Sequence, residues 1–135
     1  MGLDNGFYVV SKKRDISRED LPNIIHYPFE KDYSDKVEIV YWRKCWGLRN
    51  GVMDILGKRL SEEIYYEIDS TKQVQEIIEL IASFLDKDRW EYEGDSIWEF
   101  DEIKNTLIQN IINLATIMQY MKQNPDVYLI FYDSY

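Results

Sequence analysis

The chain has 135 residues, a formal net charge of −9, one cysteine and one histidine. This length is typical of one domain, and a hydrophobic content of 45% excludes a disordered chain. The negative charge disfavours nucleic-acid binding, which depends on many Lys and Arg contacts with phosphates. One cysteine and one histidine cannot supply the ligands of a structural zinc site, and a lone cysteine excludes an intramolecular disulfide. We therefore expect no structural metal and no cofactor.

The compartment is indicated by what the sequence lacks. The N-terminal residues do not have the charged, apolar and small-residue pattern of a secretory signal, and no apolar run approaches the roughly 18 residues of a membrane span. A lone thiol is also typical of the cytosol. These features predict a cytoplasmic protein that does not enter a membrane.

The first half of the chain predicts two strands and a helix. Residues 7–10 are a short β-rich run that follows Asn5-Gly6. Residues 15–36 contain two prolines and no sustained period, so they predict a long surface loop with a short helical turn over 17–25. Residues 37–42 predict the second strand, with Val37, Ile39 and Tyr41 on one side and Glu38, Val40 and Trp42 on the other.

A helix follows, because apolar residues recur at spacings of three and four from Cys45 to Leu56. Gly57 is a plausible stop for it. Residues 63–68 alternate like a half-buried strand, and Ser70 with Gln73 then forms the capping box of a second helix that extends to residue 85.

A long helix over about residues 98–123 is predicted next; Asn124-Pro125 ends it, and a last strand follows over 127–132. Its apolar stripe is wide, since Ile108, Ile112 and Ala115 add to a regular series at spacings of three and four, while the polar face holds Asn105, Gln109, Asn113 and Lys122. A stripe this wide fits either a central core helix or a helix that also packs against a second subunit, so a homodimer through this helix is one expectation.

The element order is strand, strand-helix, strand-helix, long helix, strand. This order is not a regular βαβ repeat, so it predicts an α+β fold. We expect residues 1–135 to form a single compact domain. Its small, mostly antiparallel sheet should be packed by three helices, including the long core helix.

Charge is distributed unevenly and marks one candidate binding surface. Residues 37–60 carry a net charge of +3, whereas residues 61–135 carry −11. Aromatic and cationic side chains alternate within the basic segment, as they do in protein–protein hot spots and in base-stacking sites. The predicted partner- or ligand-binding residues are Trp42, Arg43, Lys44, Trp46 and Arg49. The alternative is that Trp42 and Trp46 are core residues.

A second candidate surface is acidic and lies before the long helix. Its residues are Asp88, Glu91, Glu93, Asp95 and Glu99. An EF-hand that begins at Asp88 fails, because positions 3 and 5 would be Trp90 and Tyr92, so no metal site is predicted. The acidic half could imitate a nucleic-acid backbone in a basic groove of another protein, or it could be an ordinary solvated face.

No catalytic residue is assigned. The only histidine, His26, lies among apolar neighbours and is interpreted as structural, and Cys45 lies on the apolar side of its helix and is expected to be buried. No phosphate-binding glycine motif and no nucleophile elbow is present. The chain is therefore expected not to be an enzyme, although an enzyme without a recognisable motif stays an alternative.

Three features together resemble a family of small phage and prophage proteins. These are the opening Met1-Gly2-Leu3-Asp4, the Tyr41-Trp42-Arg43-Lys44 box and the tyrosine-rich C-terminus. The chain departs from the family after the box, where Cys45-Trp46-Gly47-Leu48 replaces an Asn-rich helix that contains histidine. The resemblance implies a phage context in the cytoplasm of a bacterial host, and it implies no reaction.

Small acidic phage proteins often inhibit host enzymes or antiviral defence. The resemblance therefore leads to the expectation that this protein binds and modulates a host protein, as a counter-defence inhibitor. The alternative is a binding protein for a small anionic ligand such as a nucleotide, held by Arg43, Lys44 and Arg49 beside Trp46.

Overall fold

The computed structural model describes residues 3–28, 30–85 and 100–135. The predicted acidic surface of residues 88–99 lies outside this range. The elements, in chain order, are β1 (Asp4–Ser11), a 3₁₀ turn (Arg18–Asp20), β2 (Lys36–Arg43), α1 (Trp46–Leu56), β3 (Tyr65–Ile68), α2 (Thr71–Leu85), α3 (Phe100–Gln123) and β4 (Val127–Ser134).

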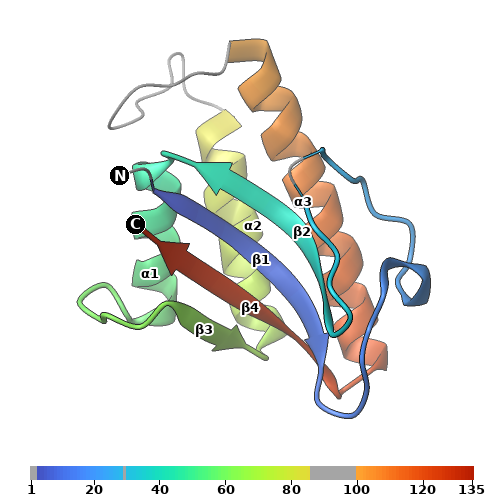
Figure 1. The fold of residues 1–135 in the computed structure, drawn as a ribbon. Coiled ribbons are helices and arrows are strands. Elements are labelled where there is room, and N and C mark those ends of the chain that lie inside the picture. Colours follow the sequence, from blue (N-terminus) through green and yellow to red (C-terminus); the bar gives the residue numbers. More distant parts are fainter. Residues whose placement is uncertain (1–2, 29, 86–99) are drawn as a thin grey trace.

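The four strands form one antiparallel sheet in the order β2-β1-β4-β3. All three helices pack on the same side of this sheet, behind it in Figure 1, so the fold has two layers. The predicted α+β class, with a small antiparallel sheet packed by three helices, is confirmed.

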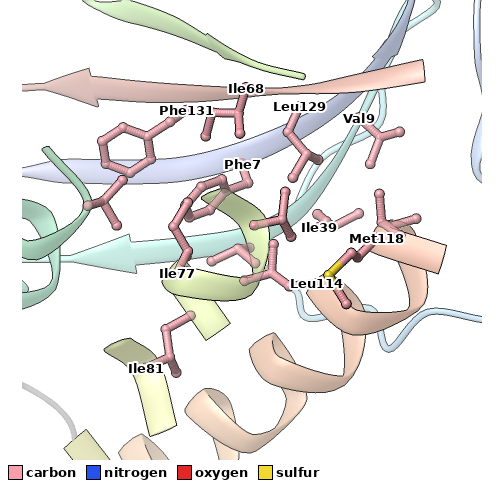
Figure 2. Close-up of a cluster of buried hydrophobic side chains, with 14 of the residues drawn as sticks. Phe7, Val9, Ile39, Ile68, Ile77, Ile81, Leu114, Met118, Leu129 and Phe131 are labelled. Carbon is pink, nitrogen blue, oxygen red and sulfur yellow. The ribbon is translucent and has the colours of Figure 1, made fainter. Parts of the chain in front are cut away.

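The core lies between the sheet and the helices. Figure 2 shows side chains from both layers meeting there, with Phe7, Leu129 and Phe131 on the strands facing Ile77 of α2 and Leu114 of α3. All five of these side chains are fully buried. Each strand contributes alternate residues, as a sheet with one covered side requires.

One strand departs from the predicted alternation. The pairing of β1 with β2 shifts register between Phe7 and Tyr8, so that Val40 lies opposite Phe7 and Glu38 lies opposite Tyr8. A β-bulge of this kind inserts one extra residue into β2, which is why Ile39 and Val40 are both buried. The prediction that Val40 shares a side with Glu38 is therefore wrong.

The turn from β2 into α1 is sharp. Lys44 has a φ of 57°, in the left-handed region, and its N–H donates to the carbonyl of Leu3 at 2.8 Å. Cys45 is the N-cap of α1, and it is buried as predicted. The helix ends at Gly57, where a φ of 68° confirms the predicted stop.

The long helix α3 buries the predicted apolar series at Leu107, Leu114 and Met118, but the margins of this stripe differ from the prediction. Asn113 was assigned to its polar face, but it is fully buried and faces the sheet. Conversely, Ile108 and Ile112 are 45% and 44% exposed. A buried amide is tolerated here because Asn113 accepts a hydrogen bond from the N–H of Ile25 and donates to the carbonyls of Ile25 and Ile39. A homodimer contact through the exposed isoleucines stays a prediction.

The segment between β1 and β2 runs over the surface, and over residues 17–25 the structure has the short 3₁₀ turn alone, less helix than predicted. His26 lies on this segment with its side chain 45% exposed and its Nδ1 3.8 Å from Glu30 Oε2. The apolar neighbours of His26 in the sequence therefore do not enclose its side chain, and its interpretation as a structural residue stays a prediction. Among the helices described, none is long and apolar enough to cross a bilayer.

Candidate functional site

The basic segment does not form one continuous surface. Trp42 is fully buried: its ring packs edge-on against Phe7, and its Nε1–H donates to Asn110 Oδ1 at 2.8 Å. This places Trp42 in the core, which was the alternative interpretation. Arg43 is exposed and Lys44 is half-buried.

Arg49 is buried and paired. Its guanidinium donates to both carboxylate oxygens of Asp133, with the shortest contact at 2.8 Å, and Asn5 donates to the same carboxylate. The ring of Tyr135 lies between the guanidinium of Arg49, at 5.4 Å, and the half-buried ring of Trp46, at 5.7 Å. This cluster ties α1 to the C-terminal strand. Whether the more accessible Arg43, Lys44 and Trp46 bind a partner or ligand stays a prediction.

The side of the sheet opposite the helices carries a surface that the sequence interpretation missed. Side chains of directly opposite residues point to the same side of a sheet, so the register places the outward residues in rows. One row holds Tyr41, Gly6, Tyr132 and Tyr65; the next holds Glu38, Tyr8, Ile130 and Glu67; a third holds Lys36, Val10 and Tyr128. We call the outward residues Tyr8, Tyr41, Tyr65, Tyr128, Ile130 and Tyr132 the tyrosine face.

Tyr132 crosses the middle of this face, over Gly6. A Cβ at position 6 would lie 2.6 Å from the Tyr132 ring and 2.9 Å from its hydroxyl oxygen, so only glycine leaves room for the ring. The ring of Tyr132 also stacks on Tyr8, with centroids 5.1 Å apart. An aromatic residue that covers a glycine on the neighbouring strand is a known device for stabilising a sheet.

Glu38 lies beneath these tyrosines and is only 2% exposed. Burial raises its pKa above the usual value, while hydrogen bonds donated by the hydroxyls of Tyr132 and Tyr8 act in the opposite direction. Burial also raises the pKa of both tyrosines. Both phenols therefore stay protonated near neutral pH and act as hydrogen-bond donors.

Other contacts hold the rim of the tyrosine face in place. Tyr33 packs edge-on against Tyr8, and the ammonium of Lys36 lies 5.1 Å from both rings. At the other end, the Tyr41 hydroxyl donates to Asp4 Oδ1 at 2.6 Å. Tyr8, Tyr41 and Tyr132 are thus held by other aromatic rings or by charged neighbours.

The two edges of the sheet differ. At the β2 edge, Asp32 forms a bridge with Val37, and the N–H of Glu38 donates to the carbonyl of Lys31 at 2.8 Å. Arg18 holds this covering segment by donating to both carboxylate oxygens of Asp32 and to the carbonyl of Glu38. The β2 edge is therefore partly covered by the chain itself.

No strand in the described part of the chain pairs with the outer edge of β3. A cavity of about 540 Å³ lies there instead, lined by Leu56, Lys58, Glu63, Tyr65, Tyr66, Glu67 and Gln73. Three large apolar side chains nearby are unusually accessible: Leu60 is 95% exposed, Ile64 is 52% and Tyr65 is 61%. Tyr65 belongs to both this edge and the tyrosine face.

Sequence patterns could have pointed to the tyrosine face only in part. Tyr128, Ile130 and Tyr132 occur at alternate positions, which indicates a shared side of one strand, but the pairing with Tyr8 and Tyr65 depends on the register.

Within the described ranges, no three acidic, histidine or cysteine side chains gather closely enough to hold a metal ion. Comparison with family models, curated proteins and solved structures finds no significant match.

Proposed function

We propose that this chain is a small acidic phage-type protein that binds a host protein through its tyrosine face and thereby modulates it, as a counter-defence inhibitor. The observation that carries the proposal is a tyrosine-rich side of the sheet that none of the three described helices covers. The phage context rests on the resemblance in residues 1–4 and 41–44.

Tyrosine suits a binding surface because it offers a large contact area and a polar tip at low conformational-entropy cost. Here Tyr8 and Tyr132 are each only 9% exposed and stack on each other, so they form a fixed centre that a partner would not have to order. Such preorganisation lowers the free-energy cost of association. Tyr65 supplies accessible aromatic area beside this fixed centre.

The alternative of a small anionic ligand has less support. Of the three cations proposed to hold it, Arg49 already donates three hydrogen bonds to the Asp133 carboxylate. A buried pair of this kind is strongly destabilised when one partner is withdrawn, so Arg49 is not available to an anion.

Photo-crosslinking in a bacterial host tests the proposal. Benzoylphenylalanine is placed at position 65, on the tyrosine face, and at the exposed position 75, on α2, as the control. We expect one discrete host-protein adduct from position 65 and none from position 75. Adducts from position 75 alone, or from neither position, would overturn the proposal.

The captured protein is then purified and its affinity measured. Ile130→Glu, on the tyrosine face, should raise the dissociation constant at least tenfold, because it places a charge in the centre of the contact. The matched control Ile112→Glu, on the solvent side of α3, should change it less than twofold. Equal losses for both variants would point to a contact elsewhere.

A further inference from the structure

We infer that the free edge of β3 binds an extended, basic segment of the partner protein as a fifth strand of the sheet. The inference rests on the proposed function, since it concerns how a protein partner is held. It goes beyond that function because it names an adjoining edge that shares Tyr65 with the tyrosine face, main-chain pairing as the mode of binding, and the charge of the segment bound.

Among the described residues, none pairs with the backbone groups of β3 that point outward. The N–H of Asp133 donates to the carbonyl of Ile64 at 2.7 Å, so residues 64 and 133 are a hydrogen-bonded pair. In an antiparallel ladder such pairs alternate, so Tyr66 and Ile68 bond to β4, whereas the N–H and C=O groups of Tyr65 and Glu67 face the open edge. Two residues with one donor and one acceptor each offer four main-chain hydrogen bonds to an added strand.

The surroundings of this edge select the charge of that strand. Between residues 61 and 70 the chain carries Glu62, Glu63, Glu67 and Asp69 and no basic residue, and all four acids are exposed. Among the described side chains that line the cavity, Lys58 is the one cation, and with Glu63 and Glu67 it gives these side chains a net charge of −1. A segment with Lys or Arg at alternate positions complements this charge.

The cavity provides room for the other side chains of such a segment. It lies directly along Tyr65, Tyr66 and Glu67 and has a volume of about 540 Å³, enough for side chains at alternate positions of a short strand. The exposed Leu60 and Ile64 flank it and offer apolar contact. Together the unpaired backbone, the cavity and the acidic rim form a site for an extended basic peptide.

A second copy of the chain fits this edge less well. Pairing two β3 edges would bring the four acidic residues of each copy together, and like charges across paired strands are destabilising. Exposed charges on an edge strand act against self-association for this reason. The occupant is therefore a segment of opposite charge.

Amide hydrogen exchange, measured by NMR on the full chain, tests the inference with a defined probe. The probe is a capped seven-residue peptide of alternating Lys and Val. At saturating peptide, exchange at the amides of Tyr65 and Glu67 should slow at least tenfold, because these two donors become hydrogen-bonded. A peptide with Glu in place of Lys, or one methylated on every backbone nitrogen, should give no such slowing.

A charge reversal gives the matched comparison. Glu67→Lys should weaken binding of the Lys-Val peptide about tenfold, whereas Glu79→Lys, on the exposed side of α2, should weaken it less than twofold. Unchanged exchange at the two amides, or equal binding of the methylated peptide, would overturn the inference. If exchange at these amides slows as the protein concentration rises, without any peptide, the edge binds a second copy of the chain. That result would also overturn the inference.

Different results would refute the proposed function and the β3 edge site. A host protein captured from position 65 whose complex leaves the amides of residues 65 and 67 freely exchanging would refute the edge site and keep the proposed function. Peptide protection of these amides without any host-protein adduct would support the edge site and count against the tyrosine face.

Discussion

Gly6→Ala provides a sharp test of how the tyrosine face is built. The added Cβ would lie 2.5 Å from the Val40 carbonyl oxygen and 2.6 Å from the Tyr132 ring. Neither atom can move away freely, because one is backbone at the β-bulge and the other is buried. Overpacking of this kind costs about 1–3 kcal/mol.

We therefore expect Gly6→Ala to lower the free energy of unfolding by about 1–3 kcal/mol. The sign is informative, because replacing glycine by alanine in a strand without such contacts stabilises by about 0.5–1 kcal/mol. Equilibrium unfolding in urea, followed by tryptophan fluorescence, measures the change.

Gly51→Ala in α1 is the matched control. There the close atoms are the methyl carbons of Leu80, at 2.6 Å, which belong to the end of a flexible side chain. Alanine also favours helix by about 1 kcal/mol, so the net change should be under about 1 kcal/mol. If Gly6→Ala unfolds at the same urea concentration as the unmodified protein, or at a higher one, the proposed role of Gly6 is refuted.

Three further changes test the buried polar groups and one turn. Arg49→Leu leaves the Asp133 carboxylate without its ion-pair partner in the core, so it should lower the free energy of unfolding in urea by about 3–5 kcal/mol. Adding Asp133→Asn should recover much of this loss, and no recovery would contradict the pairing. Burial raises the pKa of Glu30 from 4.5 to about 8, so its contribution to stability is complete below pH 4.5 and is lost as the pH rises through 8. Glu30→Gln should therefore exceed the unmodified protein in stability at about pH 8.5 but not at about pH 5, and parallel pH profiles would refute this. Gly57 has a left-handed φ of 68° and open space around it. Gly57→Ala should therefore lower the free energy of unfolding by about 1 kcal/mol and lower the melting temperature, and an unchanged melting temperature would exclude strain there.

The sequence predicted the elements well where hydrophobic period and stop signals agree. Gly57 ends α1 as its position suggests, and Ser70 precedes α2 and accepts a hydrogen bond from the N–H of Gln73. Periodicity could not show the extra residue at Ile39, because a bulge depends on how two strands pair. It also misplaced Asn113, since a buried amide is stable only when its backbone partners, here at Ile25 and Ile39, are brought to it by the fold.

The candidate surfaces, like the elements, could be predicted only where one segment of the sequence carries the information. Alternation of aromatic and cationic residues could not separate Trp42, which is buried, from Arg43, which is exposed. The tyrosine face needs four strands in register before it exists, because its residues come from positions as distant as Tyr8 and Tyr132. Local patterns in one strand do not contain that information.

The place of β1 and β4 has a consequence for the order in which the protein folds. These two strands are neighbours at the centre of the sheet, yet they join residues 4–11 to residues 127–134. Contacts so distant in sequence slow folding, because a long loop must close before they form. On the ribosome, the helices and the β1–β2 pair can form early, but the sheet cannot close until residues 127–134 have been synthesised. Until then the free edges of β1 and β3 are both open to other chains.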